Sequence, residues 1–177
     1  ELLAGGPSSA AGHAAELLVQ AHLMIGTGYR LGCYQPGVDD DHKDIVVVEK
    51  GAFSALYVQV KSTTHLDSEG RVVCMADYPE GGIAESPRFV YVMTVVAEPE
   101  QRVARCWLVP SADFNRLAYR QHSAGRPGRV VLQFSCRAGG DPVWEAYELA
   151  PTALGAAVER VLETAPEDVG FGLAAFG

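Results

Sequence analysis

The hydrophobic and polar positions change period along this chain, from a helical spacing near the N-terminus to strand-like runs and back again. Within residues 9–26, one apolar stripe at helical spacing consists of Ala14, Leu17, Leu18, Ala21, Met24 and Ile25. Val19 and Leu23 lie on the other side of the predicted helix, in the same sector as Glu16. We therefore expect a helix that is covered on both sides and keeps Glu16 from being a plain surface acid. A carboxylate on the helix surface is the alternative for Glu16.

Two strand-like runs follow, joined by a short turn. The first is Asp44–Glu49, the second contains Gln59-Val60-Lys61, and Gly51 lies at the predicted hairpin bend between them. Alternate side chains of a strand share a face, so Gln59 and Lys61 point together while Val60 points into the core. Either hairpin register places Asp44 on the face of Gln59 and Lys61. An ordinary cross-strand ion pair between Asp44 and Lys61 is the simpler alternative.

The remaining pattern predicts more strands and two further helices. Strands are expected at 29–34, 71–76, 89–96, 102–109 and 129–135, with a short extended piece at 144–149, and helices at 112–121 and 152–163. The run 89–96 is nearly all apolar and is predicted to be a central strand buried on both faces. This order indicates an α/β (α+β) fold, a mixed β-sheet flanked by helices. We expect one domain over residues 1–177, with 164–177 as a flexible or docking tail.

Composition places the chain among ordinary globular proteins. It has 177 residues, of which 48% are hydrophobic and 20% charged, which fits a single domain with a sizeable core. The four cysteines show no Cys-x-x-Cys spacing, which predicts buried free thiols in the cytoplasm rather than a zinc site. No apolar run reaches the roughly 18 residues of a membrane span, so no membrane association is expected. The chain begins with Glu1 rather than Met, which is consistent with a missing upstream segment.

The predicted helix and hairpin together form a recognisable motif. The segments Gly12-His13-Ala14-Ala15-Glu16, Asp44 and Gln59-Val60-Lys61 resemble the PD-(D/E)xK nuclease superfamily, whose restriction-endonuclease-like core runs α-β-β-β-α-β. The resemblance covers residues 9–63. Gln59 stands where the commonest pattern has Glu or Asp, and this Gln-x-Lys variant is similar to that of Mrr-like restriction enzymes and other bacterial nuclease-fold domains.

The resemblance implies a divalent-metal site and a catalytic set of Lys61, Gln59, Glu16 and Asp44. Mg²⁺ or Mn²⁺ would be held by Asp44, Glu16 and the backbone carbonyl of Val60, because hard cations prefer oxygen ligands and one or two carboxylates suffice. Gln59 would offer a neutral amide oxygen in place of a carboxylate. Lys61 would position the attacking water and stabilise the charge that builds on the phosphate.

Charge bears directly on DNA as a partner. The formal net charge of −8 opposes binding of a polyanion. However, no acid lies between Phe114 and Arg137, a segment that contains Arg116, Arg120, Arg126, Arg129 and Arg137, whereas the stretch from Asp141 onward has seven acids and only Arg160. The arginines Arg116, Arg120, Arg126 and Arg129 are candidate DNA contacts; solvated surface arginines are the alternative.

Two functions follow from these observations. The first is a divalent-metal-dependent DNA endonuclease that hydrolyses phosphodiester bonds in bacterial restriction, repair or mobile-element biology. The second is a catalytically inactive nuclease-fold module that serves in binding or assembly. A homodimer, a larger assembly or a missing segment could supply DNA contacts that this acidic chain lacks.

Overall fold

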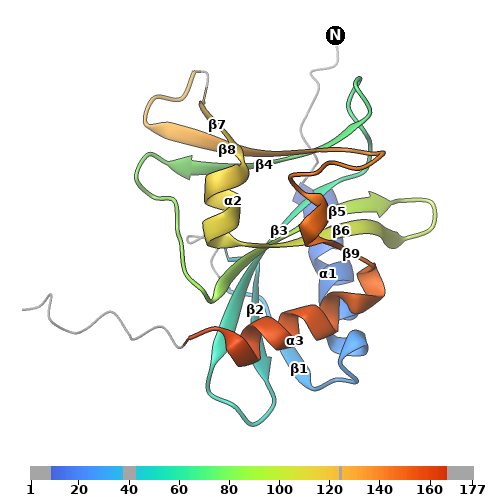
Figure 1. The fold of residues 1–177 in the computed structure, drawn as a ribbon. Helices are drawn as coiled ribbons and strands as arrows, with labels where there is room; N and C mark the ends of the chain where they lie inside the picture. The colour runs from blue at the N-terminus through green and yellow to red at the C-terminus, as the bar shows by residue number, and fades with distance from the viewer. Residues whose placement is uncertain (1–8, 38–42, 124, 167–177) are drawn as a thin grey trace, which may run out of the picture.

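The computed structural model describes residues 9–37, 43–123 and 125–166, which fold into helices and strands in the order shown in Figure 1. The helices are α1 (Ser9–Gly26), α2 (Ser111–Leu117) and α3 (Leu154–Thr164). The strands are β1 (Leu31–Tyr34), β2 (Ile45–Glu49), β3 (Ala55–Thr63), β4 (Arg71–Pro79), β5 (Phe89–Ala97), β6 (Arg102–Pro110), β7 (Tyr119–His122), β8 (Arg129–Arg137) and β9 (Glu148–Leu149). Short 3-10 helices precede β9, at Glu145–Tyr147, and α3, at Pro151–Ala153. Most of the predicted tail, residues 167–177, lies outside the described part of the chain.

A six-stranded mixed sheet forms the centre of the molecule. Its order is β1-β2-β3-β5-β6-β9, and β3 pairs with β5 in parallel while the other neighbours are antiparallel. The mixed α+β fold predicted from the sequence is therefore confirmed. The strand β5 is buried on both faces, with Tyr91, Val92 and Met93 each at 0% exposure. This burial explains its continuous apolar sequence.

Helices α1 and α3 cover one face of this sheet. Ala15, Val19 and Leu23 of α1 are fully buried against it, and α3 contributes the predicted inner face of Leu154, Val158 and Leu162. The expectation that both sides of α1 are covered is wrong, because Leu17 and Ile25 are 51% and 64% exposed. The sheet and α3 pack against the side of α1 that carries Ala15, Val19 and Leu23, whereas Leu17 and Ile25 lie on the exposed side.

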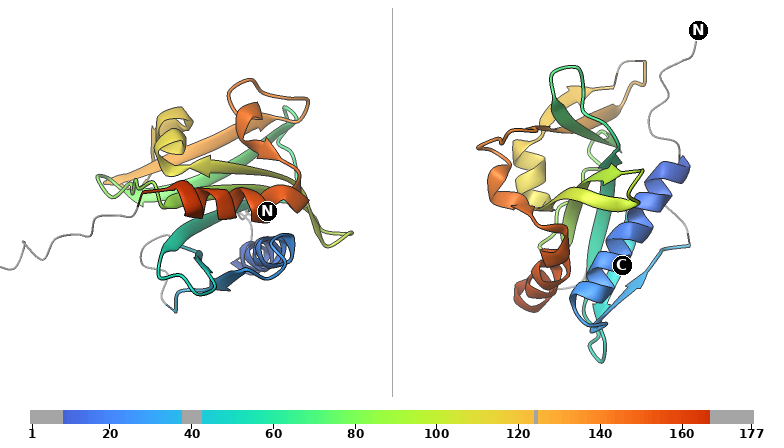
Figure 2. Two further views of the ribbon diagram at one scale, coloured as in Figure 1. Left: turned by 60° about the horizontal axis from the view of Figure 1, so that its bottom comes forward. Right: turned by 90° about the vertical axis from the view of Figure 1, so that its right-hand side faces the viewer.

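The other face of the sheet is covered by a second sheet and by α2, as the views in Figures 1 and 2 show. This three-stranded antiparallel sheet has the order β4-β8-β7. Its inner side and α2 enclose a second core with Phe114, Phe134 and the two tryptophans, Trp107 and Trp144, at its centre. Both tryptophans are thus core residues.

One predicted helix is shorter than expected. The pattern predicts a helix over 112–121, but α2 ends at Leu117, and the residues that follow form β7. The reason is pairing: Tyr119–His122 align with β8 residue by residue. The hydrogen bonds of that ladder compete with further helical turns, and pairing with the following strand leaves no helical-spacing signal in residues 118–122.

The four cysteines are free thiols, with Cys74, Cys106 and Cys136 buried. Burial raises the pKa of Cys74 to about 12, which disfavours the reactive thiolate. Within the described residues, no helix has the length and apolar character needed to cross a membrane.

Candidate active site

Asp44 is fixed at the edge of β3 by two hydrogen bonds. Its backbone N–H donates to the Val58 carbonyl at 3.0 Å, and its carboxylate Oδ2 accepts the Val60 N–H at 2.6 Å. Asp44 directly precedes β2, and its carboxylate thus continues the hydrogen bonding between β2 and β3 by one more position. In a β-strand the N–H and C=O of one residue point toward the same edge, so the Val60 carbonyl faces this edge as well. The predicted ligands Asp44 and Val60 therefore meet at one place on the sheet.

Glu16 reaches the same place from α1. Its Oε2 accepts a hydrogen bond from Gln35 Nε2 at 3.1 Å and lies 3.3 Å from His13 Nδ1. The side chain is 23% exposed, whereas that of His13 is 57% exposed. Glu16 is therefore held in a defined position rather than lying free on the helix surface.

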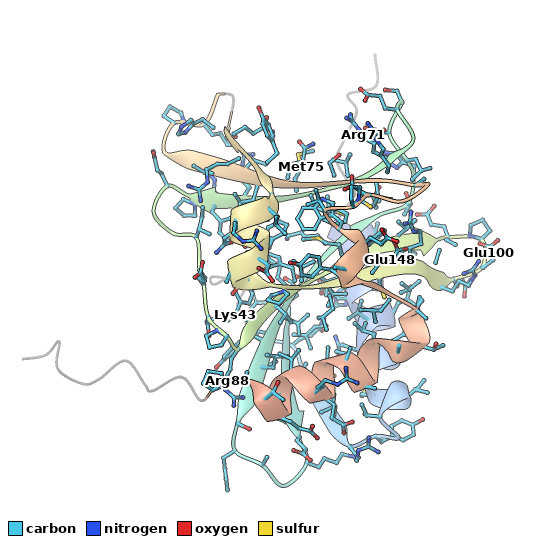
Figure 3. All side chains as sticks on the ribbon, in the orientation of Figure 1. Lys43, Arg71, Met75, Arg88, Glu100 and Glu148 are labelled. Atoms are coloured by element: carbon cyan, nitrogen blue, oxygen red, sulfur yellow. The ribbon has the colours of Figure 1, made fainter. Side chains whose placement is uncertain are left out.

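The two carboxylates line one open pocket of about 210 Å³, whose walls are formed by His13, Glu16, Gln35, Pro36, Lys43 and Asp44. Helix α1, the residues that follow β1 and the residues that precede β2 each contribute to it, so the pocket exists only in the folded chain. Lys43 lies 4.8 Å from the centroid of the Tyr57 ring in a cation–π contact (Figure 3). The pocket is polar, with hard oxygen donors and a lysine at its wall.

Gln59 lies elsewhere. Its side chain is 1% exposed, on the sheet face that the second sheet covers, and its Oε1 accepts a hydrogen bond from the Tyr78 hydroxyl at 2.7 Å. The Tyr78 hydroxyl is also hydrogen-bonded to that of Tyr91. Burial raises the pKa of Tyr78 to about 12 and that of Tyr91 still further. The amide oxygen expected to face a metal is thus engaged by a tyrosine, and a ligand role for Gln59 stays a prediction that requires its amide to turn.

Lys61 follows Val60 on β3 and is half-buried. Its backbone carbonyl accepts a weak hydrogen bond from the Cys74 thiol at 3.7 Å. Lys61 is not among the described residues that line the pocket, whereas Lys43 is. The structure therefore brings together Glu16, Asp44 and the Val60 edge, and it leaves the catalytic role of Lys61 as a prediction.

The predicted DNA-contacting arginines lie away from this pocket. Arg116, on α2, forms an ion pair with Asp113 at 2.7 Å. Arg120 is exposed on β7. Arg126 and Arg129 both contact Asp77, at 2.8 Å and 2.9 Å. Three of these four arginines thus belong to the second sheet and the loop between its strands.

Sequence reasoning missed the residues that complete the pocket. His13 lies one helical turn before Glu16 and contacts it. Lys43 adjoins Asp44, so the sequence signal was a lysine directly before the predicted ligand. Gln35 carried no such signal, because its contact with Glu16 joins two separate elements.

No protein-family model matches the sequence, and no curated protein matches it. Among solved structures, the chain is similar to a bacterial homing endonuclease, I-Ssp6803I. The identity is 17%, the alignment covers 90% of this chain and 100% of that one, and the TM-score is 0.49. At this degree of similarity the comparison assigns neither a family nor an activity, so the site geometry has to support the function proposed below.

Proposed function

We propose that this protein is a divalent-metal-dependent nuclease that hydrolyses phosphodiester bonds in DNA. The observation that supports this most is the meeting of Glu16 and Asp44 in one polar pocket at the edge of β3. Two carboxylates from separate elements, beside a strand-edge carbonyl, are the oxygen donors that Mg²⁺ or Mn²⁺ prefers.

The donor set fits such a cation. Asp44 Oδ2 accepts the Val60 N–H, which holds the carboxylate at the edge of β3 beside the Val60 backbone. Glu16 and the Val60 carbonyl would complete the protein's share, and water would fill the remaining positions. A bound cation would lower the pKa of a water ligand and stabilise the charge on the phosphate.

Two lysines are candidates for the cationic group that contacts the phosphate. The family pattern predicts Lys61, whereas the pocket is lined by Lys43. We propose that Lys43 contributes to phosphate binding at the pocket wall, beside whatever part Lys61 plays in activating water. Separate Lys43→Ala and Lys61→Ala variants distinguish these roles, because loss of a binding lysine raises KM while loss of a catalytic lysine lowers kcat.

A catalytically inactive nuclease-fold module is the second candidate. It is favoured by one observation: within the described residues, no cluster of three or more His, Cys, Asp or Glu side chains could hold a metal ion. A module of this kind would retain the fold and the pocket but would bind a partner without cutting it.

The test is cleavage of supercoiled plasmid and linear single-stranded DNA in Mg²⁺, Mn²⁺ or EDTA. Asp44→Asn and Glu16→Gln should each reduce metal-dependent cutting at least about 100-fold, since even partners outside the ligand shell cost 10–100-fold. Glu163→Gln, an exposed carboxylate on α3, is the matched control and should cut normally. Calorimetric titration of Mn²⁺ should show binding that Asp44→Asn weakens. Folded protein that neither binds Mn²⁺ nor cuts would refute the enzyme and support the module.

A further inference from the structure

Among the described residues, the outer face of the β4-β8-β7 sheet carries exposed side chains of an unusual composition. Register places Met75, Gln133 and Tyr119 directly across from one another on the three strands. Directly opposed residues of antiparallel strands share a face. Met75 and Tyr119 are 58% and 64% exposed, whereas Phe134, next to Gln133 in β8, is fully buried on the inner side. The thioether of Met75 and the phenol of Tyr119 are therefore exposed in one row across the sheet.

This sheet also carries a basic charge in an acidic protein. Over residues 71–79 and 119–137 the chain has a single acid, Asp77, and five arginines, namely Arg71, Arg120, Arg126, Arg129 and Arg137. The whole chain, in contrast, has 22 acidic and 14 basic residues. The strands of this sheet, at the top in Figure 1, and the β7–β8 loop thus have more basic than acidic residues, unlike the chain as a whole.

The arginines differ in how far their charge is already balanced. Arg126 and Arg129 share the one carboxylate of Asp77, so this group of three retains a positive charge. Arg71, labelled with Met75 in Figure 3, is paired with Asp67 and Glu69 in the turn before β4, so it adds little. Arg120 lies directly across from Leu132, whose side chain is buried on the inner side, so it does not belong to the outer face. The unbalanced positive charge of the outer face therefore comes from Arg137 and from the group of Arg126, Arg129 and Asp77.

We infer that this outer face binds single-stranded DNA. Phosphates would contact Arg129 and Arg137 of β8 and Arg126 of the β7–β8 loop, and bases would stack on Tyr119 and pack on Met75. Open sheet faces with exposed aromatic residues bind unpaired bases, because every base offers a planar face whatever its sequence. A double helix would present its bases edge-on and could not use the Tyr119 ring in this way. This inference rests on the proposed nuclease function and deepens it, since it names the form of the substrate.

The surface also resolves the difficulty posed by the net charge. Repulsion between a protein of charge −8 and a polyanion is screened beyond about 10 Å at moderate salt. Local arginines can therefore dominate binding where the strand lies on them, while acids on the α3 side are too distant to matter.

The experiment is binding of a fluorescently labelled oligothymidylate, followed by anisotropy in EDTA so that no cutting occurs. Tyr119→Ala should weaken binding about tenfold, the effect of losing one stacked base. Arg126→Gln and Arg137→Gln should weaken binding and also lower the slope of log K against log salt by about 0.7 each. Arg160→Gln, an exposed arginine on α3, is the matched control and should bind like the unaltered protein. Circular dichroism verifies that each variant is folded.

Several outcomes would overturn the inference: no binding of oligothymidylate, equal loss in Arg160→Gln, tighter binding of duplex, or equally effective competition by polyglutamate, which would indicate an acidic protein partner. The two proposals fail separately. Oligothymidylate binding that depends on Tyr119 without any cutting would support this surface and refute the nuclease. Metal-dependent cutting with unchanged binding in the Tyr119 and arginine variants would do the reverse.

Discussion

The buried Tyr78 hydroxyl provides the sharpest test of how the two sheets are joined. It donates to Gln59 Oε1 at 2.7 Å and is hydrogen-bonded to the Tyr91 hydroxyl, so it connects β4 of the second sheet to β3 and β5 of the first. Tyr78→Phe removes only this oxygen and keeps the ring that packs in the core. We expect the variant to fold normally and to be less stable.

The magnitude follows from which groups are left unpaired. Gln59 is 1% exposed, so its amide oxygen would lose a donor that water cannot replace, which costs about 1–3 kcal/mol. The Tyr91 hydroxyl would lose a partner as well, for about 1 kcal/mol more. The free energy of unfolding should therefore fall by about 2–4 kcal/mol. With a slope of about 2 kcal/mol/M for urea, the unfolding midpoint should fall by about 1–2 M.

Equilibrium unfolding in urea, followed by circular dichroism, measures this change. Tyr34→Phe is the matched control, because Tyr34 is 61% exposed, and it should change the free energy by less than about 0.5 kcal/mol. In a Gln59→Leu background, Tyr78→Phe should cost clearly less than alone, since no amide oxygen is then left unpaired. A loss below about 0.5 kcal/mol for Tyr78→Phe alone would show that the buried network does not stabilise the fold, and the reasoning above would be refuted.

Two further predictions concern close packing and titration. Gly155→Ala should destabilise the protein by about 1–3 kcal/mol, because its added Cβ would lie 3.0 Å from the Leu23 carbonyl oxygen where α3 crosses α1. The same change at Gly12, where no atom lies within 4 Å, should instead stabilise α1 by about 0.5–1 kcal/mol; thermal unfolding that ranks the two variants alike would contradict this. Stability should also fall at alkaline pH, because burial raises the pKa of Tyr78 to about 12 from 10.0 and that of Cys74 to about 12 from 9.0. Above about pH 9 the unfolded chain releases these protons while the native state retains them, so the urea midpoint in reducing buffer should be lower at about pH 10.5 than at about pH 8, and an equal midpoint would count against it.

The local elements were largely predictable from the sequence. The bounds of α1 coincide with the predicted helix, and β5 is the buried central strand that its continuous apolar run indicates. The inner face of α3 is the predicted one. Such features are local, because helical and strand periodicities are written in residues that are near neighbours along the chain.

The candidate site was predictable only in part. The motif indicated that Glu16 and Asp44 would come together, and both line the pocket. It did not indicate Lys43 or Gln35 as pocket residues, and it placed Gln59 on an accessible face that β4 in fact covers. Alternation along a strand shows which side chains share a face, but it carries no information about what packs on that face.

The sequence by itself thus determined the helices, the hairpin and the pair of carboxylates that they present. The tertiary structure alone decided that α2 ends at Leu117 so that β7 can pair with β8, that a second sheet buries Gln59, and that Arg126 and Arg129 meet Asp77 on that sheet. The physical reason is the range of the interactions: backbone periodicity acts over a few residues, whereas sheet pairing and burial depend on segments that are distant in the sequence and meet only when the chain is folded.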